Sequence, residues 1–272
     1  VQELLQQLSA AQEDLPDGLA ALLKNQKNLA EQLNQISNSL ENMLQMKAGK
    51  NKELQEFIGK FSQAQIGKLA AIQPNLVFVD SDTLNDGFSC VTTDFNRSVI
   101  RVIDHFLKVG ISDIGLIAGE EETADHETAL IDPRFRTFKQ YMTDLKLYQA
   151  KSVYIGPFTS QSGYELMKAA ITELGDQLPQ AFFVASDAMA VGALRALQEA
   201  QIPVPGRVQL ISFNGTPITK QVYPSLSSIS VFTEEMGIQA VDLLDQIRQA
   251  HRPFHPRMIK LGTELTIRES SL

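Results

Sequence analysis

Residues 181–215 read AFFVASDAMAVGALRALQEAQIPVPGRVQLISFNG, and this stretch decides the fold class. Its opening FFVAS is an apolar run with the length of a buried parallel strand, too short for a helix. From Met189 to Ala200 the apolar residues recur at helical spacing, and Asp187 stands where a helix N-cap is expected. Prolines then break the helix, and VQLISF predicts a second buried strand that ends at Asn214. The stretch therefore predicts a strand, helix, strand unit whose strands end in polar side chains. In open α/β sheets this edge binds small ligands.

Short segments of strand and helix character alternate over the rest of the chain from residue 57. Strands are expected in FIGKF, NLVFVD, SCVTTD, DIGLIAG and KSVYIG, and the segment RMIKLGTELTIRES closes the chain as a pair of strands. Helices are expected over residues 62–72, 99–110, 132–147, 160–174 and 233–249. This alternation predicts parallel sheets with helices on both faces.

Residues 1–56 differ from the rest, because they are rich in Gln, Asn, Leu, Lys and Glu and have almost no β-branched or aromatic residues. A short helix is expected before the LPDG turn, and a second helix begins near Leu19. Apolar residues of this second helix follow the alternating steps of three and four that are typical of a coiled coil: Leu22, Leu29, Leu33, Ile36, Leu40 and Met43. The segment is either an amphipathic helix packed on its own protein or a surface for self-association.

Composition excludes several classes of protein. A net charge of −8 and a pI near 5.1 argue against a chain that binds nucleic acid throughout, since duplex binding depends on Lys and Arg. The single cysteine, Cys90, excludes an intramolecular disulfide, and no apolar run reaches the length of a membrane span. We therefore expect a cytoplasmic protein.

No motif points to catalysis. The four histidines are scattered, so that no metal site is expected, and neither a phosphate-binding loop nor a nucleophile elbow is present. We expect a binding protein that uses no cofactor and is not an enzyme.

The stretch quoted first and the PSLSSISVFTEEMG that follows it resemble the effector-binding core of the LacI/GalR family of bacterial transcriptional repressors. The resemblance extends back, in order, through YIGPFTSQSGYELM, DPRFRTFKQYM, HFLKVGISDIGLIAG, VTTDFN and LVFVDSD. It implies a two-lobed α/β fold, similar to that of the periplasmic sugar-binding proteins, in which a small molecule, expected to be a sugar, closes the cleft between the lobes. Lobe one is expected at residues 57–112 and 231–250, and lobe two at residues 113–230 and 251–272.

The resemblance also implies partners. The family dimerises through this core, so a homodimer is expected. Residues 1–56 depart from the family, because they contain no basic recognition helix and no Val/Ile-rich opening strand. DNA binding is therefore expected only through a helix-turn-helix region absent from this chain. The alternative is a stand-alone or engineered sugar-binding module without DNA-binding activity.

Arg134 and Phe158 are the first two candidates for effector binding. Arg134 falls four residues before Phe138, in the family's Arg-x-x-x-aromatic pattern, and its planar fork of donors suits a sugar diol. A surface salt bridge to Asp132 or Glu127 would also explain it, and Arg136 replaces it if the register differs. Phe158 stands where the family has an aromatic that stacks on the ligand, although a core position explains it too.

The other four candidates end strands or begin helices. Asn214 stands where the family usually has an aspartate that accepts hydrogen bonds from ligand hydroxyls, and an Asx turn would also explain it. Ser186 can line the cleft with its hydroxyl, whereas Asp187 suits the helix cap. Asp94 lies at the corresponding edge of lobe one and could meet the ligand from the other side.

Overall fold

Buried apolar runs form the centre of a six-stranded sheet in the computed structural model, which describes residues 60–272 except 124, 127–128, 251–253 and 272. The order of the strands is β11-β9-β8-β7-β3-β6. Their bounds are β3 (Ile114–Gly119), β6 (Val153–Gly156), β7 (Ala181–Val184), β8 (Gln209–Asn214), β9 (Ser227–Ser230) and β11 (Glu264–Thr266). All neighbours pair in parallel except β11, which runs antiparallel to β9. The helices expected in residues 1–56 lie outside the described residues.

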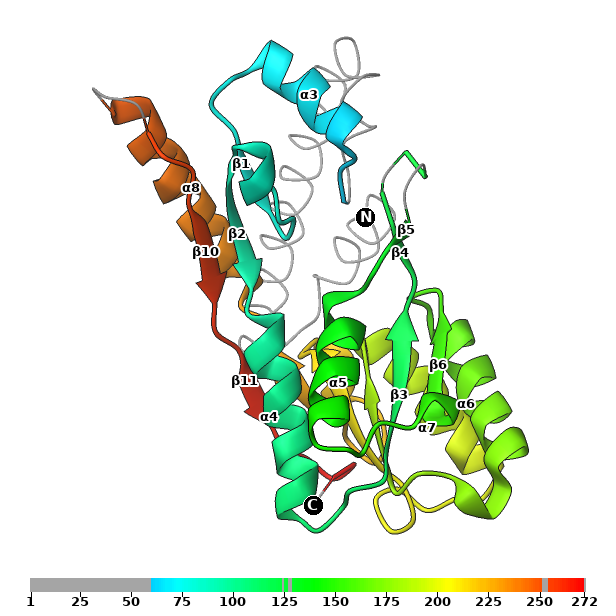
Figure 1. The fold of residues 1–272 in the computed structure, drawn as a ribbon. Coiled ribbons are helices and arrows are strands. Elements are labelled where there is room, and N and C mark those ends of the chain that lie inside the picture. Colours follow the sequence, from blue (N-terminus) through cyan, green and yellow to red (C-terminus); the bar gives the residue numbers. More distant parts are fainter. Residues whose placement is uncertain (1–59, 124, 127–128, 251–253, 272) are drawn as a thin grey trace, which may run out of the picture. The chain divides into compact units, whose positions relative to one another are not determined.

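Two pairs of helices cover this sheet, one pair on each face (Figure 1). Alternate residues of a strand point to opposite faces, so Phe182 packs with α6 (Ser160–Leu174) and α7 (Asp187–Glu199). Its neighbour Phe183 packs with α4 (Phe95–Lys108) and α5 (Pro133–Asp144). The predicted parallel sheet with helices on both faces is confirmed.

The helices α6 and α7 approach closely enough to exclude side chains at their crossing. A Cβ on Gly192 would lie 1.8 Å from the carbonyl oxygen of Ser160, and one on Gly163 would lie 2.1 Å from that of Met189. Glycine at both positions therefore allows the two backbones to touch.

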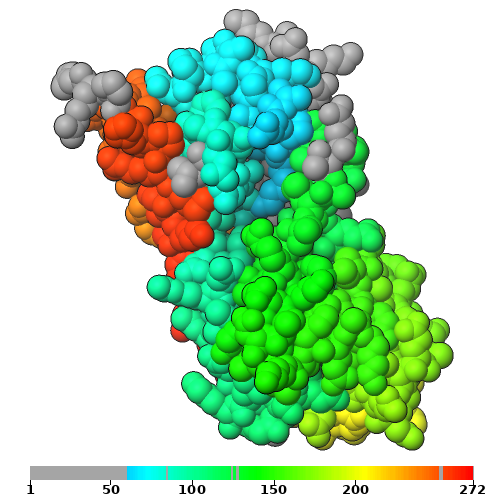
Figure 2. Space-filling model, viewed as in Figure 1, coloured from blue at the N-terminus to red at the C-terminus, as the bar shows by residue number. Residues whose placement is uncertain are grey.

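A smaller sheet of three parallel strands has the order β1-β2-β10. It comprises β1 (Val77–Val79), β2 (Ser89–Thr93) and β10 (Met258–Leu261), and lies between α3 (Gln63–Ile72) and α8 (Thr233–Gln249). The period of two again decides the faces, because Cys90 packs towards α3 and Val91 towards α8. Figure 2 shows these elements in cyan, orange and red, and those of the six-stranded sheet mostly in green and yellow.

Short elements complete the described chain. A hairpin of β4 (Glu121–Glu122) and β5 (Ala129–Leu130) follows β3. Single 3-10 turns lie at η1 (Leu84–Asp86), η2 (Ala150–Ser152), η3 (Gly175–Gln177) and η4 (Pro217–Lys220). Among the described residues, no helix has the length and apolarity that a membrane crossing requires.

Within the described residues, the chain passes between the two sheets three times. It leaves β2 for α4 at Asp94, leaves β9 for α8 at residues 231–232, and leaves β10 for β11 at residues 262–263. Hydrogen bonds tie two of these passages together, since the Asp94 N–H donates to Leu261 O at 2.8 Å and the hydroxyls of Ser98 and Thr263 lie 2.7 Å apart.

The structure differs from the expected lobe boundaries at two points. The helix α4 packs on the six-stranded sheet, although its residues were expected in lobe one. Conversely, β10 pairs with β2 of the smaller sheet, although it was expected in lobe two. In addition, α4 begins at Phe95 rather than at Val99, because the Asp94 carboxylate accepts a hydrogen bond from Arg97 N and caps the helix there.

Candidate functional site

Two cavities lie at the carboxyl ends of the parallel strands. The first, of about 510 Å³, lies between the smaller sheet and the elements α4, α5 and β4–β5 that adjoin the larger sheet, and we call it the inter-sheet cavity. The second, of about 600 Å³, lies beside the ends of β7 and β8 and is called the strand-edge cavity. The strand-edge cavity is lined by Glu121, Arg134, Phe158, Ser160, Ser186, Asp187, Ala188, Val191, Asn214, Thr216 and Ile218. Five of the six candidates predicted from sequence thus line one cavity, and Asp94 lines the other.

Arg134 is held by both ends of its guanidinium. Asp132 is the N-cap of α5, and the same carboxylate accepts from the Arg134 backbone N–H and from its Nε, both at 2.8 Å. The Nη1 group donates to Ala185 O at 3.0 Å, and the Nη2 group to Glu121 at 3.3 Å. The predicted ion pair with Asp132 is therefore present, but it is buried rather than on the surface, since Arg134 is 7% exposed.

Aromatic rings surround the same guanidinium. Its carbon lies 4.8 Å from the ring centre of Phe158 and 5.4 Å from the ring centres of Phe95 and Phe213. Phe158 also lies against Gly119, where an added Cβ would come within 1.9 Å of the ring. Phe158 is half-buried, so one part of it packs in the core while another faces the strand-edge cavity.

Asp187 does not cap α7, which corrects the sequence prediction. Ser186 is the N-cap, and its hydroxyl accepts from Met189 N at 3.2 Å. Serine and aspartate are both common N-cap residues. Asp187 is already the first residue of the helix, and the N-cap is the residue before it, Ser186.

The carboxylate of Asp187 instead joins three segments that follow it. It accepts from the hydroxyls of Ser212 on β8 and Ser228 on β9, at 2.5 and 2.7 Å. It also accepts from the N–H and hydroxyl of Thr216, at 2.6 and 2.8 Å. Asp187 is only 2% exposed, and its hydrogen bonds connect the start of α7 to β8, β9 and the loop at Thr216 in the wall of the strand-edge cavity.

Asn214 ends β8 and is exposed in the strand-edge cavity. Its φ of 115° is unusual for a residue with a side chain, and glycine follows it at a φ of 71°. The Asn214 amide makes no hydrogen bond with another described residue, so the Asx turn considered above is not formed. The amide is therefore available to a ligand.

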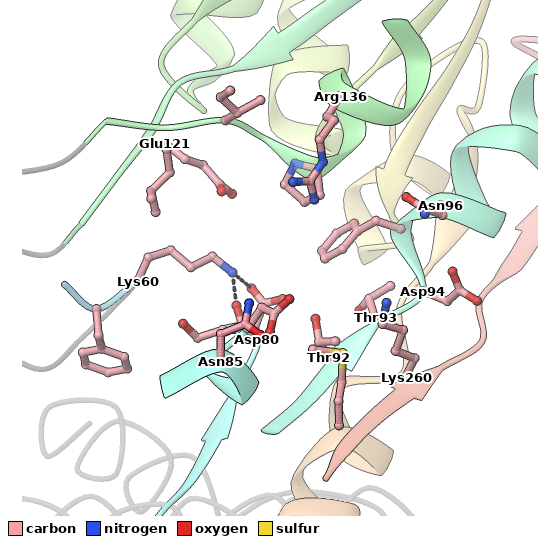
Figure 3. A pocket seen from close by; sticks show the side chains of 18 of the residues that line it. Lys60, Asp80, Asn85, Thr92, Thr93, Asp94, Asn96, Glu121, Arg136 and Lys260 are labelled. Carbon is pink, nitrogen blue, oxygen red and sulfur yellow. Dashed lines mark hydrogen bonds and ion pairs between the residues drawn. The ribbon is translucent and has the colours of Figure 1, made fainter. Parts of the chain in front are cut away.

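The walls of the inter-sheet cavity carry charges of both signs (Figure 3). Three cationic residues, Lys60, Arg136 and Lys260, and four acidic residues, Asp80, Asp82, Asp94 and Glu121, line it. Lys60 pairs with the Asp80 carboxylate at 3.0 Å, as the dashed lines in Figure 3 show. Asn85, Asn96, Thr92 and Thr93 add neutral polar groups. Because the charges nearly balance, the wall suits a neutral polar ligand better than a phosphate.

Sequence reasoning missed Lys60, Lys260 and Glu121. Lys260 lies within β10, and only the pairing of that strand with β2 brings it to the cavity. Glu121 follows the end of β3, which was a usable signal, because polar residues just after parallel strands meet at one edge. The pKa of the Glu121 carboxyl is raised, chiefly because burial disfavours its charged form. The positive charges of Lys60 and Arg134 oppose this shift, and the negative charges of Asp132 and Asp80 add to it.

No group of three or more His, Cys, Asp or Glu side chains among the described residues has the arrangement of a metal site.

Comparison with known proteins identifies this architecture. The model of the periplasmic binding protein-like domain matches residues 103–271. The HTH-type transcriptional regulator GalR of Streptococcus thermophilus is 50% identical over 214 residues, which are 79% of this chain and 64% of that protein. GalR of Lacticaseibacillus casei is 43% identical over 215 residues, 79% of this chain and 65% of that protein. The chain thus spans slightly less than two thirds of the length of these regulators.

Among solved structures, the transcriptional regulator CelR–cellobiose complex has a TM-score of 0.62 and 24% identity, and the match covers 71% of this chain and 58% of that one. At this identity the likeness shows the fold alone. It agrees with the periplasmic-binding-protein-like α/β fold that the sequence predicted, which the family match confirms.

Proposed function

We propose that this chain binds a neutral sugar at the two cavities. The chain belongs to the periplasmic binding protein-like domain family, and it is the effector-binding domain of a LacI/GalR-type regulator, not an enzyme. The observation that carries the proposal is the convergence of Arg134, Phe158, Ser186 and Asn214, from four separate segments, on the strand-edge cavity. These groups provide donors, an acceptor and an aromatic face, the combination with which proteins bind sugar hydroxyls and the apolar face of the ring.

The charge balance of the inter-sheet cavity supports a neutral saccharide. The smaller sheet lines one side of that cavity, and the β4–β5 hairpin together with the starts of α4 and α5, which pack on the larger sheet, lines the other. A ligand there therefore contacts the smaller sheet and elements attached to the larger sheet at once. Such a ligand favours one arrangement of the sheets over others, and this population shift is the signal that a regulator needs.

The names of the relatives support a proposal for the regulatory partners. The similar proteins are HTH-type transcriptional regulators, so sugar binding here would control a DNA-binding region, and the protein would act in the cytoplasm as a homodimer. Light scattering on the purified chain tests the dimer.

Calorimetric titration and thermal unfolding with galactose, glucose, ribose, lactose and cellobiose test the ligand. A sugar at about 100 times its dissociation constant should add about 2.7 kcal/mol to the free energy of unfolding. Two variants locate the site. Phe158→Ala removes the aromatic face, and Asn214→Gly removes the amide while glycine tolerates the positive φ.

Ile155→Ala is the matched control, because Ile155 is a 42% exposed apolar residue of the same strand region that lines neither cavity. Both site variants should weaken binding at least tenfold, and the control should not. If the folded wild-type chain responds to no sugar in the panel, the proposed ligand class is wrong.

A further inference from the structure

We propose that Glu121 is a sugar-binding residue whose carboxylate accepts hydroxyl hydrogen bonds beside the donor edge of Arg134, so that the pair selects sugars with two neighbouring hydroxyls. This inference rests on the proposed sugar-binding function and names the residue that sets its specificity.

The position of Glu121 is the first observation. It lines both cavities, so a ligand that enters either one meets its side chain. Figure 3 shows this side chain in the inter-sheet cavity. Its backbone is held on both sides. The preceding Glu120 N–H donates to Gly156 O at 2.9 Å, and Glu121 pairs with Leu130 in the β4–β5 hairpin. The side chain is 17% exposed, so it is placed in the cavity rather than spread over the surface.

The contact with Arg134 is the second observation. The distance of 3.3 Å from Nη2 to Oε1 is longer than the roughly 2.7–2.9 Å of a strong charge-assisted bond. The other oxygen, Oε2, accepts no hydrogen bond from a described residue. The carboxylate is therefore oriented by Arg134 and still has acceptor capacity, while Arg134 is fixed on its other sides by Asp132 and Ala185.

The chemistry of a sugar diol fits this pair. Each hydroxyl donates one hydrogen bond and accepts others. A guanidinium edge next to a carboxylate offers a donor and an acceptor at the spacing of neighbouring hydroxyls, and a neutral diol leaves the ion pair intact. A phosphorylated ligand would place its negative charge against Glu121 and is disfavoured.

The electrostatic surroundings make this binding depend on pH. Lys60 and Arg134 favour the ionised carboxylate, whereas burial, Asp132 and Asp80 disfavour it, and the pKa of Glu121 is raised as a result. A protonated carboxyl loses acceptor capacity, so sugar affinity should fall as the pH drops through this raised pKa.

A competing role makes the opposite prediction. If Glu121 only occupies the place of the sugar on Arg134, removing its charge should strengthen binding. The experiment therefore measures the affinity of Glu121→Gln and Glu121→Ala for whichever panel sugar binds the wild type, at about pH 7.5 and about pH 5. Glu120→Gln is the matched control, an exposed neighbour that lines neither cavity.

We expect Glu121→Ala to weaken binding about tenfold at the higher pH, and Glu121→Gln to weaken it less. The wild type and Glu120→Gln should lose affinity on acidification, and Glu121→Gln should not. Equal or tighter binding by both Glu121 variants, or an unchanged pH dependence in Glu121→Gln, overturns this inference while the sugar-binding function stands. If no sugar binds the wild type, both proposals fall. Should Glu121→Ala fail to fold, the isosteric Glu121→Gln decides.

Discussion

Replacing Asp187 by alanine should destabilise the protein much more than its small side chain suggests. The carboxylate accepts four hydrogen bonds, all between 2.5 and 2.8 Å, from Ser212, Ser228 and Thr216. A hydrogen bond to a charged group contributes about 1.5–3 kcal/mol, but such terms are not additive. The two serine hydroxyls have second acceptors, Ser227 O at 3.3 Å and Ile229 O at 3.4 Å, to which they can turn.

The loss therefore falls mainly on the two groups of Thr216, and we expect Asp187→Ala to lower the free energy of unfolding by about 3–5 kcal/mol. Urea unfolding followed by circular dichroism measures this. Asp176→Ala, at an exposed aspartate, is the control and should stay within about 0.5 kcal/mol of the wild type. Ser186→Ala, which removes the N-cap of α7, should cost about 1 kcal/mol of stability.

A different result would refute the structural role. If Asp187→Ala unfolds like the wild type but no longer responds to sugar, the carboxylate serves the ligand and its hydrogen bonds contribute little to stability.

Three further predictions concern packing, pH and capping. Gly192→Ala should lower the free energy of unfolding by about 3 kcal/mol, because the added Cβ would lie 1.8 Å from the Ser160 carbonyl oxygen. Gly67→Ala should raise it by about 0.5–1 kcal/mol, because nothing lies within 4 Å of the added Cβ. The midpoints of urea unfolding measure both changes. Because the pKa of Glu121 is raised in the folded protein, its ionisation costs stability at neutral pH, and this cost disappears as the pH falls below its unfolded value. Glu121→Gln should therefore raise the melting temperature of the sugar-free protein near pH 7 but not in acid, and equal shifts at both would contradict the sign. Asp94→Ala should lose about 1 kcal/mol with the α4 cap, and Asp94→Asn should keep that stability; weaker sugar binding by Asp94→Asn would give Asp94 a ligand role as well.

Local patterns predicted the strands and helices well wherever a single kind of signal was present. The apolar runs that became β3, β7 and β8 needed no information from distant residues, because a strand buried on both faces is continuously apolar. Two adjacent residues of capping type, Ser186 and Asp187, made the start of α7 uncertain by one position. Both residues suit an N-cap, and only the serines and threonine around Asp187 show which role it has.

The candidate site was predicted in part for a similar reason. Residues that follow parallel strands meet at one edge by topology, so Phe158, Ser186 and Asn214 could be placed together from sequence. Lys260 could not be placed from sequence. It lies in β10, which reaches the cavity by pairing with β2 more than 160 residues earlier in the chain, and no local pattern records so distant a pairing. The ring contacts around Arg134 are likewise products of tertiary packing.

The division of the last strands between the two sheets has a consequence at the level of the gene. Only residues 262–263 separate β10, which completes the smaller sheet, from β11, which lies at the edge of the larger one. A stop codon just before Met258 would therefore take a strand from both sheets at once. A nonsense mutation at this point should be as damaging as mutations in the central strands, and neither sheet can be transplanted as one contiguous piece of coding sequence.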